Sequence, residues 1–210
     1  MPPDARVIVL AGPSGAGKSR LAERLEHRFG WPTLRLDDFY LDADATGLPV
    51  IAEGANAGLV DWDDPRSWDR EAAVAALVEL CRTGACEVPG YSISASRRIG
   101  SRRLDLAGAP VFCAEGIFAP DVVQACEAAG VLAHAYCVTQ HPLVTFARRL
   151  SRDLRERRKP PPVLVRRGWA LARAQPGVVR RAVQAGCRVA TGDRAFAQIS
   201  SWWEASRAAS

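Results

Sequence analysis

Short apolar runs alternate with amphipathic segments along the chain. Residues 6–11 form an apolar run that is typical of a buried strand, and residues 111–114 and 131–138 have the same character. Between the first two runs, apolar residues recur every fourth position at Leu21, Leu25 and Phe29, which predicts an amphipathic helix over 19–29. This alternation predicts an α/β fold, a three-layer sandwich in which helices cover both faces of a central parallel sheet.

The remaining elements follow from the same pattern and from turn residues. Ser67 has the side chain of an N-cap, so we expect a helix over 68–82 to begin there. Residues 41–66 are rich in Gly, Ala, Asp and Pro and predict a loop, and residues 83–105 predict a small hairpin. Further strands are expected at 33–36 and 188–190, and helices at 121–129, 142–159, 163–185 (broken near Pro176-Gly177) and 196–205.

Composition limits the class of protein. The chain has 210 residues, 48% hydrophobic and 24% charged, which suits one soluble domain over 1–210. No stretch is apolar enough to span a membrane, and the N-terminus reads as a first strand rather than a signal peptide. Six cysteines without a Cys-x-x-Cys pair predict reduced thiols in a cytoplasmic protein.

The net charge of +5 is unevenly distributed. Residues 148–159 are strongly basic, whereas residues 37–69 lean acidic. A basic run of this kind is typical of a solvated helix or a nucleic-acid patch. Aromatic residues for base stacking are absent from it, so we expect no nucleic-acid partner and no membrane partner. We interpret residues 142–165 instead as a basic helical lid that neutralises a bound phosphate.

That phosphate is implied by a loop of the form Gly-x-x-x-x-Gly-Lys-Ser/Thr between the first strand and the first helix. Glycines let the backbone fold around phosphates, and the helix N-terminus supplies positive potential. Lys18 would reach the β- and γ-phosphates of ATP or another nucleoside triphosphate, and the Ser19 hydroxyl would bind Mg²⁺. The loop consists of Gly12, Pro13, Ser14, Gly15, Ala16, Gly17, Lys18 and Ser19.

Two acids follow predicted strands. Asp37 could accept a proton from an attacking hydroxyl or help to hold the metal, and Glu115 has the form of a second metal-assisting carboxylate. Each also has a plainer interpretation, as an acidic surface turn and as a strand that ends in solvent. Because parallel strands place their carboxyl ends at one edge of the sheet, both acids are expected beside the phosphate loop.

Further candidates lie on the hairpin and the basic helix. Tyr91 stands on a glycine-containing excursion, where packing is the commoner role. Arg149, Arg152 and Glu156 fall on neighbouring turns of one helical face, and guanidinium groups suit a transferring phosphoryl group. The scattered histidines are not expected to be catalytic. Trp202 and Trp203 are expected to pack the last helix, with a contact in a homo-oligomer as the alternative.

Taken in order, six motifs resemble those of the uridine kinase family over about residues 6–195. They are the phosphate loop, Asp37-Asp38-Phe39-Tyr40, Trp62-Asp63-Asp64-Pro65, Pro89-Gly90-Tyr91, Glu115-Gly116-Ile117 and the segment Arg149-Leu-Ser-Arg152-Asp153-x-x-Glu156-Arg157. The resemblance implies a kinase that transfers the γ-phosphoryl of ATP, with Mg²⁺, to the 5′-hydroxyl of uridine or cytidine in pyrimidine salvage.

The resemblance also implies roles for single residues. Asp37 would be the general base and assist the metal, Glu115 would complete the magnesium site with Ser19, and Asp63 would bind the ribose hydroxyls. Tyr91 would form a wall of the pyrimidine pocket. Lid arginines near the phosphates and ribose would be Arg149, Arg152 and Arg157, and residues 191–193 would lie on the adenine side.

Departures from the family pattern keep other acceptors open. The pocket position two residues after the tyrosine, typically aromatic, is Ile93, and the typical histidine is replaced by Ser96. Residues Lys159-Pro160-Pro161-Pro162 also change the continuation of the lid. Pantothenate kinases and phosphoribulokinases share this core and phosphorylate other small alcohols. A nucleotide-binding regulatory protein without an acceptor is the alternative from another class.

Overall fold

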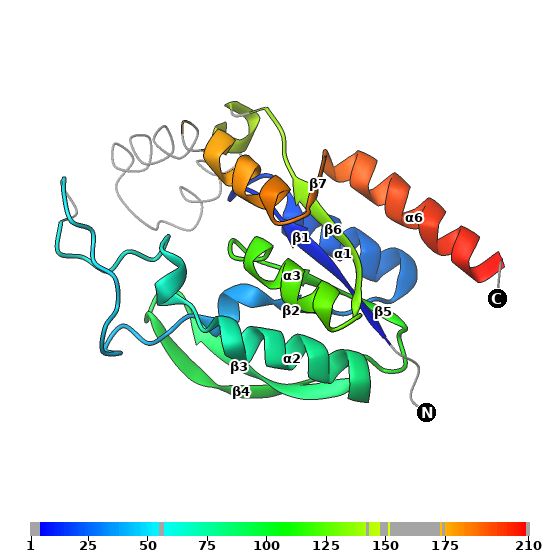
Figure 1. The fold of residues 1–210 in the computed structure, drawn as a ribbon, viewed down its shortest axis with the longest axis horizontal. Coiled ribbons are helices and arrows are strands. Elements are labelled where there is room, and N and C mark those ends of the chain that lie inside the picture. The colour runs from blue at the N-terminus through cyan, green and yellow to red at the C-terminus, as the bar shows by residue number, and fades with distance from the viewer. Residues whose placement is uncertain are drawn as a thin grey trace.

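A five-stranded parallel sheet in the order β2-β5-β1-β6-β7 forms the centre of the fold (Figure 1). The computed structural model describes residues 5–54, 57–141, 143–147, 151, 173 and 175–208. The first strand lies between β5 and β6, and all four strand pairs are parallel. The strands are β1 (Arg6–Ala11), β2 (Thr33–Arg35), β5 (Val111–Glu115), β6 (Leu132–Val138) and β7 (Arg188–Ala190).

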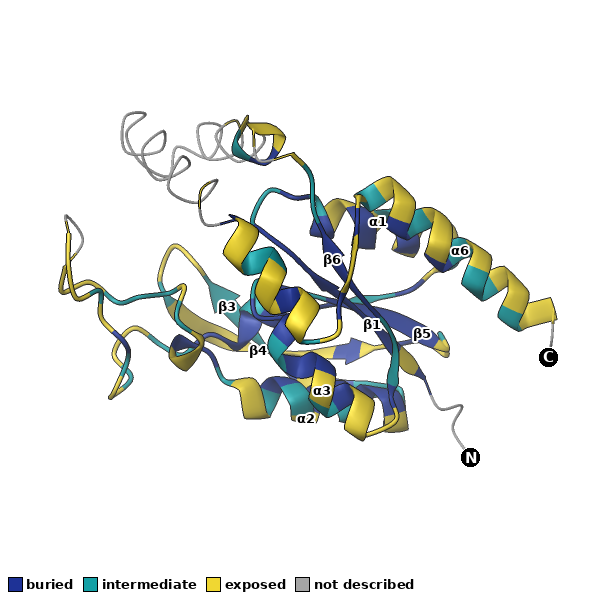
Figure 2. Cartoon of the chain, turned by 45° about the horizontal axis from the view of Figure 1, so that its top comes forward, coloured by how far each residue is buried: buried dark blue, intermediate teal, exposed yellow. Residues whose placement is uncertain are grey.

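Helices cover both faces of the sheet, as the alternating pattern predicts. Alternate residues of β1 belong to different cores: Val7 and Val9 lie in one cluster, Ile8 and Leu10 in the other. The first cluster includes residues of α2 (Arg70–Thr83) and α3 (Pro120–Ala128). The second includes residues of α1 (Lys18–Phe29) and α6 (Gly192–Ala208). Figure 2 shows the buried strands between these two exposed layers, so the predicted three-layer sandwich is confirmed.

A separate two-stranded sheet forms the predicted hairpin. Strands β3 (Ala85–Ser92) and β4 (Arg97–Asp105) pair antiparallel, and the hairpin lies beside α2 in Figure 1. Two short 3₁₀ turns complete the path of the chain, η1 (Leu36–Phe39) directly after β2 and η2 (Pro65–Ser67) before α2. Strand β3 of the hairpin packs against η1, the turn that follows β2.

Two predicted helix starts and one predicted helix break are wrong. Helix α2 begins at Arg70, because Asp69 caps it by accepting a hydrogen bond from the Ala72 N–H over 3.0 Å; Ser67 lies buried in η2 instead. Helix α6 begins at Gly192, four residues earlier than predicted. Residues 175–184 are helical throughout, so the helix has no break near Pro176 at these positions.

Most of the predicted lid lies outside the described residues. Of that segment, residues 143–147 and Ser151 are described and helical, whereas Arg149, Arg152 and Arg157 are not described. All six cysteines are buried. Trp202 and Trp203 pack as expected: Trp203 makes an edge contact with Trp31, and Trp202 with His134. In the part of the chain that the structure describes, no helix is long and apolar enough to cross a membrane.

Candidate active site at the carboxyl edge of the sheet

The phosphate loop turns tightly from β1 into α1. At Gly12 the backbone has φ of 134°, and a Cβ atom there would lie 2.2 Å from the carbonyl oxygen of Val138 at the end of β6. Gly17 is the N-cap of α1 in a left-handed conformation, at φ of 101°. Both positions therefore require glycine, one for close packing and backbone conformation and the other for conformation.

Lys18 lies across the loop that precedes it. Its side chain is buried, and Nζ donates hydrogen bonds to the carbonyl oxygens of Gly12 at 2.9 Å and Pro13 at 3.3 Å. These bonds compensate for the burial of an ammonium group. They also hold a positive charge within the ring of loop glycines, where a phosphate group would be bound.

Ser19 and Glu115 meet across the edge of the sheet. The Ser19 hydroxyl donates a hydrogen bond to Oε1 of Glu115 over 3.1 Å, although the two residues are 96 positions apart. Burial raises the pKa of Glu115 above its ordinary value of 4.5, the charge of Lys18 lowers it, and that of Asp37 raises it further. The carboxylate thus lies within the electrostatic reach of both Lys18 and Asp37.

Asp37 is held against the turn that follows β5. It lies in η1, and its Oδ1 accepts a hydrogen bond from the backbone N–H of Ile117 over 3.1 Å. A Cβ atom at Gly116 would lie 2.8 Å from Cβ of Leu36 and 2.9 Å from Oδ1 of Asp37. Because β2 and β5 are neighbours, this close approach brings Asp37 and Glu115 together, as the sequence predicts.

Three aromatic rings surround the side chain of Tyr40, which lies three residues after Asp37. The Tyr40 ring lies 5.6 Å from that of Trp62, 5.7 Å from that of Tyr91 and 5.8 Å from that of Phe118. The Tyr40 hydroxyl donates to the carbonyl oxygen of Trp62 over 3.0 Å. Burial raises the pKa of the Tyr40 phenol, and the charges of Asp37 and then Asp63 add to the rise. Both carboxylates therefore lie near this phenol.

Two predicted pocket residues differ in their placement. The Tyr91 hydroxyl donates to the carbonyl oxygen of Leu41 over 3.2 Å, and its ring packs against the core. Ile93 lies in the turn between β3 and β4 with 52% of its surface exposed, outside the ring cluster. Ser96 occupies a left-handed conformation in the same turn, and its hydroxyl donates to the Ile93 carbonyl over 3.4 Å. Tyr91 thus lies in the cluster of aromatic rings around Tyr40, and Ile93 lies outside it.

The sequence alone predicts no individual role for three residues of the site, Trp68, Tyr40 and Gly116. Trp68 donates its indole N–H to the carbonyl oxygen of Leu36 over 2.7 Å, which anchors the turn that carries Asp37. Tyr40 forms the centre of the ring cluster, and Gly116 permits the close approach of the two strand ends. Tyr40 lies in the motif 37–40 and Gly116 in the motif 115–117, so these two motifs are the sequence signal for both residues. No local pattern marks Trp68.

The donor set suits magnesium. Mg²⁺ prefers oxygen ligands and usually keeps a few protein ligands together with phosphate oxygens and water. The Ser19 hydroxyl and the Glu115 carboxylate offer such oxygens beside the phosphate loop, and Asp37 lies within electrostatic reach. Among the described residues, no group of three or more His, Cys, Asp or Glu side chains forms a separate metal site.

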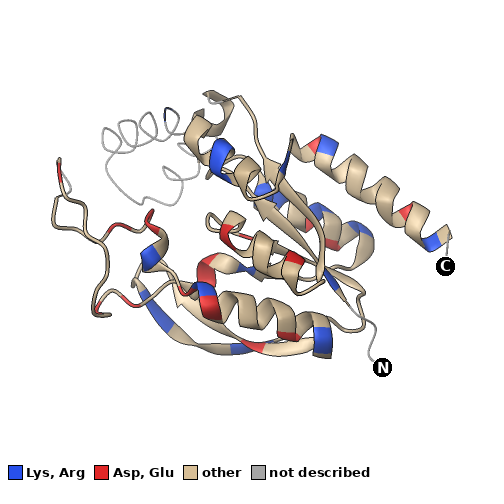
Figure 3. Cartoon of the chain, in the orientation of Figure 1, with Lys and Arg blue, Asp and Glu red and all other residues tan. Residues whose placement is uncertain are grey.

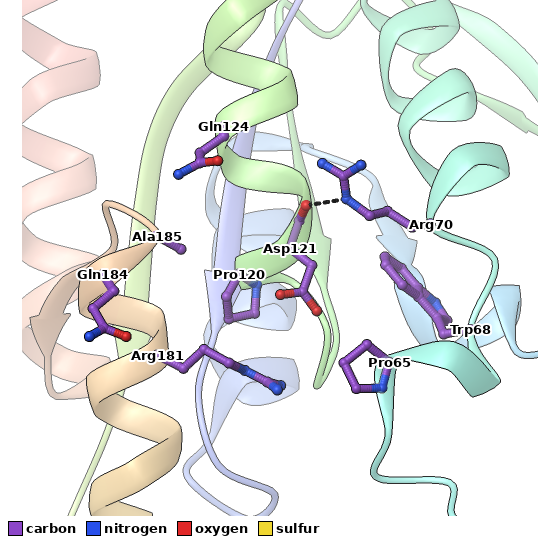
Figure 4. Close-up of a pocket in the computed structure, with 9 residues that line it drawn as sticks. All are labelled: Pro65, Trp68, Arg70, Pro120, Asp121, Gln124, Arg181, Gln184 and Ala185. Atoms are coloured by element: carbon purple, nitrogen blue, oxygen red, sulfur yellow. Dashed lines mark hydrogen bonds between the residues drawn. The ribbon is translucent and has the colours of Figure 1, made fainter. Parts of the chain in front are cut away.

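A hollow of about 440 Å³ lies beside this site rather than within it (Figure 4). It is bounded by the starts of α2 and α3 and by residues 181–185, and Arg70 crosses it to donate to the carbonyl oxygen of Asp121 over 2.8 Å. Its lining includes neither the phosphate loop nor Asp37, Glu115 and Tyr91. The candidate site is therefore defined by converging side chains and not by this hollow.

A phosphate loop between β1 and α1, with acids at the ends of two neighbouring strands, defines a P-loop phosphotransferase of the kinase class. Residues 7–160 match the Phosphoribulokinase / Uridine kinase family, and the chain belongs to that family. The family match therefore supports ATP as the nucleotide.

Individual relatives resemble parts or all of the chain. Inorganic pyrophosphatase TTM2 of Arabidopsis thaliana is 31% identical over 113 residues, which are 54% of this chain and only 15% of that protein. A solved structure from Silicibacter sp. TM1040, assigned as a fructose transport system kinase, has a TM-score of 0.59 at 17% identity and covers 90% of this chain and 89% of its own. D-glycerate 3-kinase from Cryptococcus neoformans has a TM-score of 0.50 at 15% identity, over 83% and 78%. At these identities the two structures bear on the fold alone.

Proposed function

We propose that this kinase transfers the γ-phosphoryl group of ATP, with Mg²⁺, to the 5′-hydroxyl of a pyrimidine nucleoside, uridine or cytidine. One observation carries the chemical part of the proposal. The Ser19–Glu115 pair and the Asp37 carboxylate converge on the phosphate loop from three different elements. A metal-binding hydroxyl, a metal-assisting acid and a base are the parts that phosphoryl transfer to an alcohol requires.

The reaction follows from these positions. The acceptor oxygen forms a bond to the γ-phosphorus while the bond between that phosphorus and the β,γ-bridging oxygen breaks, and ADP leaves with the electron pair. Asp37 takes the hydroxyl proton, and its hydrogen bond from the Ile117 N–H keeps the carboxylate oriented. Lys18 neutralises charge on the β- and γ-phosphates, and bound Mg²⁺ would stabilise the charge that develops on their oxygens.

The acceptor side supports a nucleoside. Asp63 and Asp37 flank the same phenol, so an acceptor whose 5′-hydroxyl meets Asp37 could present its ribose hydroxyls to the exposed Asp63. The partly exposed rings of Trp62 and Tyr91 pack on the buried Tyr40 ring and would pack against a planar base. On this proposal the enzyme serves pyrimidine salvage in the cytoplasm, and Arg149, Arg152 and Arg157 would neutralise charge on the phosphates.

A second acceptor class is favoured by one feature of the hairpin turn. Ile93 is exposed, and the Ser96 hydroxyl donates its hydrogen bond to the Ile93 carbonyl oxygen. Neither side chain therefore contributes to a pocket for a nucleobase. An acceptor without a nucleobase would not need them. A sugar phosphate or a small hydroxy acid is therefore the second candidate for the same chemistry.

A panel of acceptors tests the proposal. ADP production is measured with ATP and Mg²⁺ in the presence of uridine, cytidine, pantothenate, ribulose 5-phosphate, fructose or D-glycerate, and the phosphorylated product is identified by mass spectrometry. The proposal predicts ADP release that depends on a pyrimidine nucleoside and a 5′-monophosphate product. Product from another acceptor alone would contradict the nucleoside part. Hydrolysis of inorganic pyrophosphate without transfer to any acceptor would contradict the kinase part.

A further inference from the structure

A second acid stands next to the proposed base but makes different contacts. Asp38 follows Asp37 in η1, and only 7% of its side chain is exposed. Its Oδ1 lies 4.0 Å from Nη2 of Arg35 on β2, and its Oδ2 lies 3.8 Å from Nη2 of Arg102 on β4. The backbone N–H of Tyr91 lies close enough to this carboxylate to lower its pKa.

These partners come from three separate strands. A buried carboxylate is stable only when its charge is compensated. Here two guanidinium groups lie within ion-pair distance of Asp38, and one backbone N–H lies near it. The pKa of Asp38 is nevertheless raised above its ordinary value; burial is the largest cause of the rise, and Arg35 and Arg102 oppose it. A side chain kept at this desolvation cost suggests a function beyond filling space.

The hairpin is irregular at the point where Asp38 meets it. The register between β3 and β4 shifts between Gly90 and Tyr91, so that Gly90 pairs with Gly100 and Tyr91 with Arg98. This shift leaves Ile99 as the extra residue on β4, which is a β-bulge. Bulges re-aim side chains, and here the Tyr91 backbone N–H lies near the Asp38 carboxylate while the Tyr91 ring lies 5.7 Å from the Tyr40 ring. Figure 3 shows the acidic turn η1 and the basic residues along β4 in the same part of the fold.

We propose that Asp38 is a positioning residue that holds the acceptor hairpin against the turn carrying Asp37. Its link to Arg102 fixes β4, and its link to the Tyr91 N–H fixes the bulge and therefore the Tyr91 ring. Because Asp37 is the adjacent residue, the same side chain sets the distance between the base and one wall of the acceptor site. The inference rests on the proposed function, since it assigns Tyr91 to the acceptor.

Charge-removing variants on both sides of the link test this role. Asp38→Asn and Arg102→Met each remove the ion pair between these two side chains, and the double variant completes a double-mutant cycle. Asp44→Asn, an exposed acid of the following loop, and Arg103→Met, the neighbouring exposed arginine of β4, are the matched controls. Steady-state kinetics are measured for the acceptor that the panel identifies and for ATP, and amide hydrogen exchange is measured over residues 85–105.

We expect Asp38→Asn and Arg102→Met each to lower kcat/KM for the acceptor by about 10- to 100-fold, because a shift of about 1 Å at a reacting group costs about that much. The KM for ATP should stay within about twofold of wild type, since the phosphate loop is not part of the link. The double variant should be no worse than the poorer single variant. Exchange at the Tyr91 amide should accelerate in both single variants and not in the controls.

Other results would overturn the inference. A loss of thermal stability with unchanged kcat/KM for the acceptor would assign Asp38 a purely structural role. Additive losses in the double variant would show that Asp38 and Arg102 act separately. Unchanged amide exchange at Tyr91 would show that Asp38 does not hold the bulge. If Asp38→Asn does not fold, Arg102→Met decides, because the Arg102 side chain is 43% exposed. If wild type phosphorylates no acceptor, the proposed function fails, while the exchange data still decide whether this link holds the hairpin.

Discussion

The backbone N–H of Ile117 donates a hydrogen bond to Oδ1 of Asp37 over 3.1 Å, and this bond joins the turns that follow β5 and β2. The two residues are 80 positions apart in the chain. Parallel pairing of β2 with β5 brings them to one edge of the sheet, next to the phosphate loop. The orientation of the proposed base is therefore determined by the backbone of the segment that also supplies Glu115.

Gly116→Ala should disturb this relationship directly. The new Cβ would lie 2.8 Å from Cβ of Leu36 and 2.9 Å from Oδ1 of Asp37, so the η1 turn must move. We expect kcat to fall by about 10- to 100-fold while nucleotide affinity is retained, because the misplacement is at the acceptor side. Turnover and nucleotide titration would measure both. Gly177→Ala, where a Cβ meets nothing within 4 Å, is the control; an equal loss there would remove the steric explanation.

Gly12→Ala and Gly30→Ala separate close packing from backbone conformation. Both glycines have positive φ, but only at Gly12 would a Cβ meet another atom, the Val138 carbonyl oxygen at 2.2 Å. Gly30→Ala should lower the free energy of unfolding by about 1–2 kcal/mol, the cost of a left-handed conformation. Gly12→Ala should lower it by about 3 kcal/mol or more and abolish nucleotide binding. Chemical denaturation measures both; similar losses would contradict the packing account.

Lys18→Met should impair both binding and chemistry, because Nζ is held inside the phosphate loop by the carbonyl oxygens of Gly12 and Pro13. We expect nucleotide affinity and kcat each to fall by about tenfold or more when this charge is lost. Arg28→Met, an exposed cation at the far end of α1, is the control. Isothermal titration with a non-hydrolysable ATP analogue and turnover assays would test it. Unchanged affinity in Lys18→Met would show that the loop binds phosphate without this side chain.

The raised pKa of Glu115 should make the stability of the nucleotide-free protein depend on pH. Burial raises its folded-state pKa above the ordinary value of 4.5, so the folded protein binds this proton more tightly than the unfolded chain does. The associated stability is fully present below 4.5 and is lost as the pH rises through the raised pKa. Glu115→Gln should therefore be more stable than wild type at pH 8 and similar to it at pH 4. Denaturation curves at both pH values test this; a less stable variant at pH 8 would reverse the sign.

The same substitution should raise the Mg²⁺ concentration needed for half-maximal turnover, because an ionised oxygen next to the Ser19 hydroxyl is lost. In Glu115→Gln the stability at pH 8 should thus rise while the apparent affinity for Mg²⁺ falls. That combination separates a functional acid from a structural one, since a purely structural residue would lose stability on replacement.

The fold and the centre of the site could be predicted because their signals are local. Buried parallel strands are continuous apolar runs, so β1, β5 and β6 are visible in the sequence, and the loop at 12–19 has a fixed spacing. The meeting of Asp37 and Glu115 followed from one topological rule, that parallel strands end at a common edge.

Contacts that depend on tertiary packing could not be predicted. Ser67 and Asp69 are both good N-caps, and the 3₁₀ turn at Pro65 decides for Asp69. The need for glycine at position 116 arises from Leu36 and Asp37, which are distant in the chain. The exposure of Ile93 depends on how the hairpin turn folds over, and a single sequence carries no signal for that.

Replacement of Asp37 by Asn tests the central claim most directly, because Asn keeps an oxygen for the Ile117 N–H but cannot accept the hydroxyl proton. Nucleotide affinity by titration and acceptor-dependent turnover are measured on the same preparation. The account predicts unchanged affinity and a kcat reduced by about 100- to 10,000-fold, the range for loss of a general base. Full turnover in Asp37→Asn would contradict the assignment of Asp37 as the base.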